Sequence, residues 1–256
     1  MDNITYQRIG NGQDVVLLHG WASNCQIWQP LVDQLATRYR VTVIDLPGYG
    51  TNRDCVSTED LSVLAEQLRP CIPEGSWVVG WSLGGLVAMQ LASRYPALVS
   101  GLCLLASSPC FVAREGWSTA MDSDLMAAFQ AGLETDAKAT TQRFVALQCH
   151  GDKQAKPIRR VLRRSLLDNS VDPAVLAQGL RLLEQDQRIL LQNLSLPIHF
   201  VLGEQDAIVP AGLIDQLFSF GSNVTAEVWS DCSHLPFLSD TPRTVDCITA
   251  LLAATK

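Results

Sequence analysis

Short apolar runs recur along the chain, and segments with helical spacing of apolar residues lie between them. The runs cover residues 15–18, 41–44, 77–79, 102–105, 198–202 and 226–229. Fully apolar strands separated by helices are typical of a parallel sheet with both faces covered, because a strand with one exposed face would alternate apolar and polar residues. The pattern therefore predicts an α/β fold with a mostly parallel central sheet and helices on both faces.

Strand-like apolar runs are absent between Cys110 and about Leu194, where the spacing of apolar residues becomes helical. Helices are expected there near 117–133, 135–148, 157–168 and 173–187. Because this block lies between two strand-like runs, we expect a helical cap at 111–194, inserted into a core formed by 1–110 and 195–256. A chain of 256 residues is long enough for one such core domain.

The composition argues against several classes of protein. A formal net charge of −7 leaves no excess of Lys and Arg to neutralise the phosphates of a nucleic acid. The first residues form neither a basic nor an apolar leader, and no apolar stretch reaches the ~18 residues of a membrane span, so a soluble cytoplasmic protein is expected. The eight cysteines form no C-x-x-C pair, and several lie in apolar runs, which favours reduced thiols over disulfides or a zinc site.

The segment G-W-S-L-G at 80–84 carries the clearest chemical signal, because it joins the strand-like run 77–79 to the helix-like stretch 86–92. Small residues on both sides of Ser82 would let the strand and the helix approach closely, while a strained turn pushes the serine hydroxyl out of the sheet. A G-x-S-x-G motif alone occurs by chance, but the flanking strand and helix are the context that a nucleophile elbow requires. We therefore predict that Ser82 is a nucleophile and not part of an incidental turn.

A nucleophilic serine needs a base within hydrogen-bond reach and a carboxylate that fixes the tautomer of that base. Of the four histidines, His199 lies inside a strand run, His150 in the predicted cap and His19 in a loop after the first run. His234 lies between the last strand and the final helix, where a base can reach over the edge of the sheet. We therefore predict that His234 is the base.

The third member is expected between the serine and the histidine in the chain, because the order serine, acid, histidine is usual after such an elbow. Asp206 follows a strand-like run and belongs to the same edge of the sheet. Asp231 is the rival, but a residue so close to His234 in the sequence cannot easily face the imidazole from behind. Asp206 is therefore favoured, and Glu204 is a weaker candidate.

Attack by a serine on a carbonyl group places negative charge on an oxygen, and each preplaced N–H donor typically contributes about 3–4 kcal/mol. The backbone N–H of Leu83, at the start of the helix, is one expected donor. The H-G-W loop at 19–21 makes the backbone N–H of Trp21 the expected second donor and its indole a wall of an acyl pocket. Alternatively, Trp21 only packs beneath the cap. The glycine-rich stretch 45–50 lacks the motifs that cradle phosphate, so we interpret it as a structural turn.

These motifs resemble those of the α/β-hydrolase fold family. H-G-W, D-L-P-G-Y-G, G-W-S-L-G-G, G-E-Q-D-A-I-V-P and S-H-L-P-F occur in family order across the whole chain. More narrowly, the chain is similar to the pimeloyl-[acyl-carrier protein] methyl ester esterases of biotin synthesis. The similarity lies in L-L-H-G-W, V-I-D-L-P-G-Y-G, G-W-S-L-G-G-L-V-A, A-S-S-P-C-F at 106–111 and R-F-V-A-L-Q at 143–148, whereas the rest of the cap departs from that family.

The resemblance implies a cytoplasmic, monomeric serine carboxylesterase that removes the methyl group from a pimeloyl chain attached to its acidic carrier protein. It implies catalysis by Ser82, Asp206 and His234, without a metal or an organic cofactor. The implied substrate contacts are Trp21, Ser82, Leu83, Phe144, Val145, Ala146, Leu147, Gln148 and His234. Two alternatives within the fold are a general short-chain carboxylesterase and a carbon–carbon bond hydrolase. A low-turnover ligand-binding receptor is the alternative from a different class.

Basic residues are concentrated in the predicted cap. From Lys138 to Arg164 the chain has eight basic residues and one acid, a net charge of +7, whereas the rest of the chain carries −14. In the helix expected from Pro157, apolar residues recur at helical spacing and leave the arginines facing solvent. A solvated cationic face is one interpretation, but the concentration on the cap of an acidic protein favours docking of an acidic carrier protein. The expected docking residues are Arg143, Lys153, Lys156, Arg159, Arg160, Arg163 and Arg164.

Overall fold

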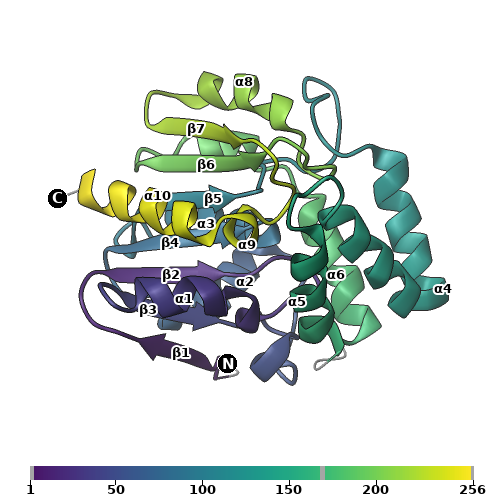
Figure 1. The fold of residues 1–256 in the computed structure, drawn as a ribbon, viewed down its shortest axis with the longest axis horizontal. Helices are drawn as coiled ribbons and strands as arrows, with labels where there is room; N and C mark the ends of the chain where they lie inside the picture. Colours follow the sequence, from purple (N-terminus) through teal and green to yellow (C-terminus); the bar gives the residue numbers. More distant parts are fainter. Residues whose placement is uncertain (1–2, 168–170, 255–256) are drawn as a thin grey trace.

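The computed structural model describes residues 3–167 and 171–254 of the chain, without the side chains of 164–167. Within these residues, seven strands form one sheet in the order β1-β3-β2-β4-β5-β6-β7 (Figure 1). The strands are β1 (Tyr6–Ile9), β2 (Asp14–Leu18), β3 (Arg40–Ile44), β4 (Ser76–Trp81), β5 (Val99–Leu105), β6 (Ile198–Gly203) and β7 (Val224–Trp229). Strands β2 to β7 are parallel, which confirms the predicted α/β sheet.

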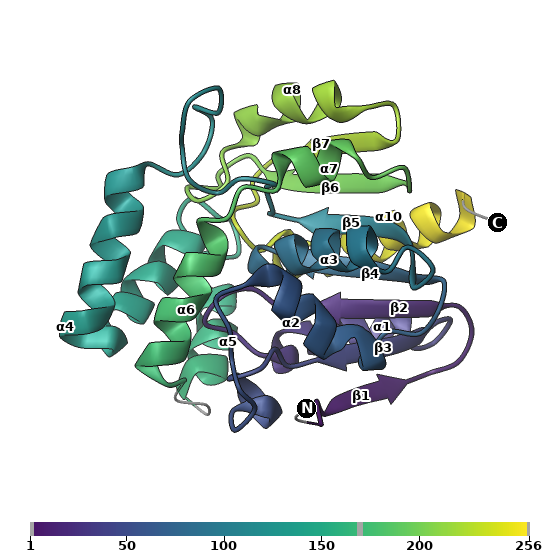
Figure 2. The same ribbon diagram turned by 180° about the vertical axis from the view of Figure 1, so that it is seen from behind.

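Helices cover both faces of this sheet, as the two opposite views show (Figures 1 and 2). One face carries α1 (Gln29–Leu35) and α10 (Thr241–Ala254), and the other carries α2 (Leu61–Leu68), α3 (Leu83–Arg94) and α7 (Arg188–Gln192). Successive side chains of a strand point to opposite faces. In β2, Val15 and Leu17 therefore join the core beneath α1 and α10, while Val16 and Leu18 join the core beneath α2 and α3. Burial on both sides explains why these strands are continuous apolar runs.

The sequence pattern does not predict β1. All four residues of this strand are exposed, and they pair antiparallel with β3 at the edge of the sheet. A strand without a buried face needs no apolar run, so the hydrophobic pattern carries no signal for it. The six predicted runs correspond to β2 to β7, and each observed strand is one to three residues longer than its run.

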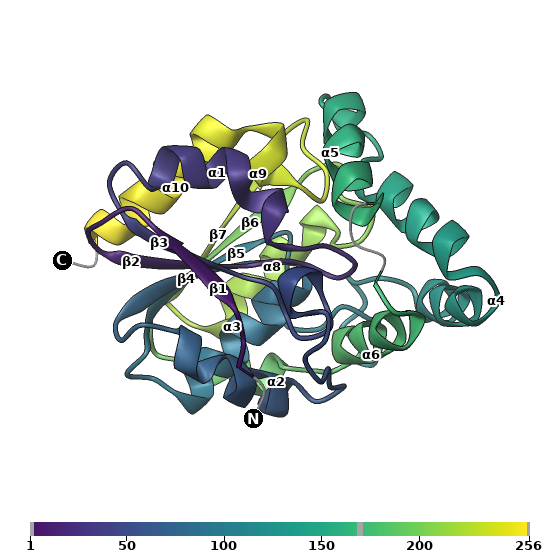
Figure 3. The same ribbon diagram turned by 90° about the horizontal axis from the view of Figure 1, so that it is seen from below.

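The helices α4 (Ser123–Gln148), α5 (Ala155–Leu167) and α6 (Pro173–Leu183), which we call the inserted helices, lie beyond the carboxyl ends of the parallel strands (Figure 3). α4 is broken at Asp136, whose φ of −154° and ψ of 89° are not helical. Its two halves correspond to the helices expected at 117–133 and 135–148. They approach closely at Gly132, where an added Cβ would lie 2.6 Å from the Thr140 hydroxyl oxygen.

Three boundaries of the inserted helices differ from the prediction, and one of them is the start of α5 at Ala155, two residues before the expected position. Asp122 caps α4 by accepting a hydrogen bond from the Asp124 N–H over 2.7 Å, so the helix begins six residues later than expected. Trp117 instead forms an isolated bridge with Arg114. α6 ends at Leu183 and the separate helix α7 follows it. Residue 168, the expected end of the third helix, lies outside the described residues.

Short elements complete the described fold. They are the 3-10 helices η1 (Cys25–Trp28), η2 (Gly50–Asn52), η3 (Arg69–Cys71), η4 (Ala211–Leu213) and η5 (Phe218–Phe220), and the short α-helices α8 (Ile214–Leu217) and α9 (Pro236–Ser239). Five of the eight cysteines are buried and three are half-buried, which is the environment of thiols that pack as small apolar groups. Over the described ranges, no helix is both long enough and apolar enough to cross a membrane.

Candidate active site

Ser82 lies at a sharp turn between β4 and α3. Its φ of 53° and ψ of −119° form a strained conformation for a residue with a side chain. Glycines make the turn possible, because a Cβ on Gly84 would lie 2.2 Å from the Leu18 carbonyl oxygen. A Cβ on Gly80 would lie 2.5 Å from the Gly84 carbonyl oxygen. The segment therefore has the strand, turn and helix geometry of a nucleophile elbow.

The side chains of Ser82, His234 and Asp206 form a chain of hydrogen bonds. The Ser82 hydroxyl donates to His234 Nε2 over 3.0 Å, and His234 Nδ1–H donates to Asp206 Oδ2 over 2.8 Å. The three residues follow β4, β7 and β6, whose carboxyl ends meet at one edge of the sheet. His234 is fully buried and Ser82 exposes only 1% of its surface. Through these two hydrogen bonds the Ser82 hydroxyl can pass its proton to the imidazole, and the Asp206 carboxylate stabilises the positive charge that results.

Asp206 is oriented by the backbone that follows it. Its Oδ1 accepts hydrogen bonds from the N–H groups of Ile208 (2.8 Å) and Val209 (3.0 Å), which leaves Oδ2 for the imidazole. Asp231, the rival candidate, is exposed and has a φ of 59° in the turn before the histidine. Glu204 is exposed as well. The structure thus brings Asp206 to the imidazole of His234, whereas Asp231 and Glu204 lie in solvent.

The loop that carries His234 is fixed by residues that the sequence does not mark for this role. The Trp81 indole N–H donates to the His234 carbonyl oxygen over 2.8 Å, and the His234 N–H donates to the Gln148 carbonyl oxygen over 3.2 Å. Asp152, between α4 and α5, accepts a hydrogen bond from the Ser233 N–H (2.8 Å), while the Ser233 hydroxyl donates to the Gln148 carbonyl oxygen (2.6 Å). The inserted segment therefore positions the histidine loop as well as covering it.

The two expected oxyanion donors lie beside the elbow. Leu83 is the first residue of α3, so its N–H has no acceptor within the helix. The loop before Trp21 packs on the elbow, because a Cβ on Gly20 would lie 3.1 Å from the Ser82 Cβ. The Trp21 indole is buried, and its N–H donates to the Leu176 carbonyl oxygen of α6 over 2.8 Å. The indole therefore packs beneath α6, while the backbone of this residue belongs to the loop at the elbow.

His19 joins the loop after β2 to the loop after β3. Its Nδ1–H donates to the Gly20 carbonyl oxygen over 2.9 Å, and its Nε2 accepts from the Leu46 N–H over 3.0 Å. Complete burial lowers the pKa of this imidazole below its usual range. Both ring nitrogens are thus used by a neutral His19, which holds the loop in place.

The side chain of Asp45, the first residue of the stretch 45–50, forms hydrogen bonds that hold this turn together. Asp45 accepts hydrogen bonds from the N–H groups of Cys25 (2.6 Å) and Thr51 (2.8 Å). A carboxylate that uses these donors leaves them unavailable to a phosphate. This geometry agrees with the interpretation of the stretch as a structural turn.

A narrow pocket lies next to the elbow, between α6 and the core. Leu83 lines it from α3, and Val175, Gly179 and Leu182 line it from α6. The other lining residues are Leu46, Pro47, Tyr49, Ser57, Thr58 and Leu64. The lining is mostly apolar, but the pocket has room for about one water molecule, so a hydrocarbon chain could enter only if α6 moved. Of this set, only Leu83 is a predicted substrate contact, because the walls come from segments that are distant in the chain.

The segment 144–148, at the end of α4, touches the site at two points. Phe144 is buried and packs edge-to-face on the Trp21 ring, with centroids 4.6 Å apart. Gln148 is buried, and its carbonyl oxygen accepts the His234 N–H. The remaining members differ in burial: Val145 is buried, Leu147 is half-buried and Ala146 is exposed.

The basic residues of the inserted helices face solvent. Ile158 and Leu162 are buried in α5, whereas Arg159, Arg160 and Arg163 of the same helix are exposed. The exposed members are Arg143, Lys153, Lys156, Arg159, Arg160 and Arg163. The side chain of Arg164 lies outside the described residues.

The chain has relatives that match it over nearly its full length. The model of the alpha/beta hydrolase family matches residues 15–246. A pimeloyl-[acyl-carrier protein] methyl ester esterase of Nitrosomonas europaea is 37% identical over 253 residues, which are 98% of this chain and 100% of that protein. A protein of the same name from Aeromonas hydrophila is 39% identical over 252 residues, which are 96% of this chain and 98% of that protein.

Solved structures share the fold. An esterase from Exiguobacterium antarcticum has a TM-score of 0.88 at 21% identity, covering 98% of this chain and 95% of its own. A bromoperoxidase from Bacillus anthracis has a TM-score of 0.88 at 19% identity, covering 97% of this chain and 94% of its own. At such identities the likeness concerns the fold alone. From the family match and the full-length relatives, the chain belongs to the alpha/beta hydrolase family and, within it, to the group that the Nitrosomonas and Aeromonas proteins represent.

Proposed function

We propose that the protein is a serine carboxylesterase that hydrolyses the methyl ester of a pimeloyl chain carried on acyl-carrier protein, a step in the synthesis of the biotin precursor. The hydrogen-bonded chain from Ser82 through His234 to Asp206 carries the proposal, because it joins a nucleophile, a base and an orienting carboxylate at one point. The names of relatives that are 37% and 39% identical support the substrate.

In the first half-reaction, Ser82 Oγ attacks the carbonyl carbon of the methyl ester while His234 Nε2 takes the hydroxyl proton. Asp206 stabilises the imidazolium that forms. The backbone N–H groups of Leu83 and Trp21 donate to the oxygen of the tetrahedral intermediate. The bond between the carbonyl carbon and the methoxy oxygen then breaks, and His234 gives its proton to that oxygen. Methanol leaves, and the acyl chain stays bound to Ser82 as an ester.

In the second half-reaction, water takes the place of methanol. His234 removes a proton from the water as its oxygen attacks the acyl carbon, and the bond from that carbon to Ser82 Oγ breaks. The proton returns to Ser82, and the chain leaves with a free carboxylate at its end. No step of this mechanism requires a metal or an organic cofactor.

We further propose that 1–110 and 195–256 form the catalytic core, and that 111–194 form a cap that shapes the acyl site. The lining of the apolar pocket by α6 supports this division, as does the contact of Phe144 with Trp21. The proposed acyl contacts on the cap are Phe144, Val145, Ala146, Leu147 and Gln148. Because Ser82 exposes only 1% of its surface, the cap must shift before a carrier-borne chain can reach the hydroxyl.

The exposed basic residues of the cap are the proposed docking surface for an acidic carrier protein. The net charge of +7 on the segment 138–164, against −14 on the rest of the chain, supports this placement. The surface comprises Arg143, Lys153, Lys156, Arg159, Arg160 and Arg163, together with Arg164. The family resemblance supports a cytoplasmic monomer, with neither a nucleic acid nor a membrane as partner.

Labelling with an organophosphonate ester tests the proposed nucleophile. One equivalent should add to the wild-type protein, and peptide mass spectrometry should find it on Ser82. Ser82→Ala should take up none and should hydrolyse no chromogenic ester, while its circular dichroism spectrum stays that of the wild type. An adduct on a different residue would remove Ser82 from this role.

A further inference from the structure

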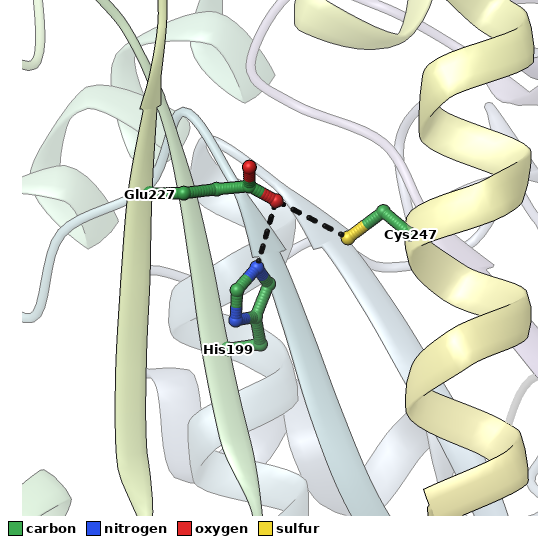
Figure 4. Close-up of side chains that lie close together, drawn as sticks. All are labelled: His199, Glu227 and Cys247. Atoms are coloured by element: carbon green, nitrogen blue, oxygen red, sulfur yellow. Dashed lines mark hydrogen bonds and ion pairs between the residues drawn. The ribbon is translucent and has the colours of Figure 1, made fainter.

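His199, Glu227 and Cys247 form a cluster of possible metal ligands outside the candidate active site (Figure 4). They come from β6, β7 and α10, so the cluster joins two strands to a helix that covers them. One ligand atom from each residue lies within 4.8 Å of the others. The side chains of His199 and Glu227 are 14% and 36% exposed, which gives ions from solvent a route to the cluster.

Two separations between the ligand atoms are close to those of tetrahedral coordination. Glu227 Oε1 lies 3.2 Å from His199 Nε2 and 3.7 Å from Cys247 Sγ. Zn²⁺ bonds of about 2.0–2.1 Å to nitrogen or oxygen and about 2.3 Å to sulfur place N and O about 3.3 Å apart, and S and O about 3.5 Å apart, at tetrahedral angles. The two observed separations differ from these values by no more than about 0.2 Å, and the third pair of ligand atoms lies within 4.8 Å. A cation can therefore enter with only small side-chain rotations.

Neighbouring side chains orient two of the ligands. The Thr225 hydroxyl donates to the Ile198 carbonyl oxygen over 3.2 Å, and its oxygen accepts from His199 Nδ1–H over 2.8 Å. This arrangement directs the lone pair of Nε2 to the cluster. Arg243 donates to Glu227 Oε2 over 3.1 Å, which leaves Oε1 for the cluster. Outer partners of this kind fix the ligands of protein metal sites.

The charges of the cluster suit a divalent cation. A thiolate with an imidazole and a carboxylate favours Zn²⁺ over the harder Mg²⁺ and Ca²⁺.

We propose that His199, Glu227 and Cys247 bind a divalent cation of the Zn²⁺ class, with water as the fourth ligand. His199 lies near the amino end of β6, about 13 Å from the carboxyl end that Asp206 follows, so the site is separate from the triad. The cation would clamp α10 to the sheet and would take no part in ester hydrolysis. The ligands are 28 and 20 residues apart, so no metal-binding motif marks them in the sequence.

Metal binding to the full-length protein, freed of metal by dialysis against a chelator, tests the proposal. The wild type should bind one equivalent of Zn²⁺ in competition with a chromophoric chelator. Co²⁺ should give the thiolate-to-cobalt charge-transfer band in the near ultraviolet. Zn²⁺ should also raise the melting temperature, because it binds the folded state.

Variants assign the binding to the cluster. Thr225→Val should weaken Zn²⁺ binding about 10–100-fold, as expected for the loss of an outer partner, and His199→Gln should weaken it further. Cys247→Ser should abolish the cobalt band, whereas the matched control Cys55→Ser should retain it. Turnover of a chromogenic ester by each variant verifies that it is folded. The proposal is overturned if the folded wild type binds no stoichiometric Zn²⁺, or if the cobalt band survives in Cys247→Ser.

Discussion

At the scale of single residues, the sequence predicts which side chains meet at the sheet edge but not what holds them there. Ser82, Asp206 and His234 are recognisable because each follows a strand, and the carboxyl ends of parallel strands share one edge. Asp152 has no comparable signal, because it meets Ser233 across 81 positions of the sequence. Its partners come together only through folding of the inserted segment, and no motif records such a pairing.

The partner of His234 can be assigned by comparing two carboxylates. Asp206→Asn should lower kcat about 10⁴-fold, because an amide at this point favours the wrong tautomer of the imidazole. Asp231→Asn should change kcat little, since this side chain is exposed in a turn. Turnover of a chromogenic ester measures both effects. The opposite pattern, with the large loss in Asp231→Asn, would transfer the role to Asp231.

Asp152 is expected to act on catalysis by positioning the histidine loop. Its Oδ2 accepts hydrogen bonds from Ser233 and from the Ser239 hydroxyl. Asp152→Ala leaves the Ser233 N–H without its acceptor, whereas the Ser239 hydroxyl can still donate to the Leu235 carbonyl oxygen. A resulting shift of about 1 Å in the imidazole can cost about 10²-fold in kcat. KM should stay near the wild-type value, and Asp152→Asn, which keeps an acceptor oxygen, should recover part of the loss. An unchanged kcat in a destabilised Asp152→Ala would limit the residue to a structural role.

At the scale of elements, the hydrophobic pattern predicts the strands that are buried on both faces and misses the strand that is exposed. Strands β2 to β7 are found from their apolar runs, whereas the exposed edge strand β1 leaves no run to find. The two halves of α4 match the separately expected helices 117–133 and 135–148, and the break at Asp136 lies next to the boundary between them. The pocket beneath α6 is not predictable, because it exists only where α6 meets the core.

The link that His19 makes between two loops should give the protein a pH-dependent stability. The folded state holds this buried imidazole neutral with a lowered pKa, whereas the unfolded state takes up a proton below about pH 6.5. Its contribution is therefore full above that pH and falls as the pH decreases, by up to about 1.4 kcal/mol per pH unit. Chemical denaturation between about pH 7.5 and pH 5 should show a steeper fall for the wild type than for His19→Gln. Parallel curves would contradict this.

At the scale of the whole molecule, basic inserted helices lie over the end of the sheet where Ser82, His234 and Asp206 are joined by hydrogen bonds (Figure 1). The insertion is predictable because the strand rhythm stops after Cys110 and resumes after Leu194. The near-complete burial of Ser82 is not predictable from the sequence, because it depends on how closely the inserted helices pack on the core.

Charge reversal on α5 separates docking from chemistry. Arg159→Glu with Arg163→Glu should raise KM for a carrier-bound ester, most strongly at low salt, because exposed charges act over about 8–10 Å at ordinary ionic strength. The kcat and KM for a small free ester should stay near their wild-type values. The matched control is Arg38→Glu with Arg69→Glu, which makes the same charge change on exposed residues near the amino ends of β3 and β4. Equal losses on both esters would make the α5 arginines part of the cap's fold, and no loss on either would make them a solvated face.

Hydrolysis of methyl pimeloyl acyl-carrier protein, compared with a free short-chain methyl ester under the same conditions, tests the central claim most directly. Mass spectrometry should show loss of the methyl group from the carrier-bound chain by the wild type and none by Ser82→Ala. The kcat/KM for the carrier-bound ester should exceed that for the free ester by about 10-fold or more, because opposite charges speed the encounter. A carrier-bound ester that is left intact, or is cleaved no better than the free one, would contradict the proposed function.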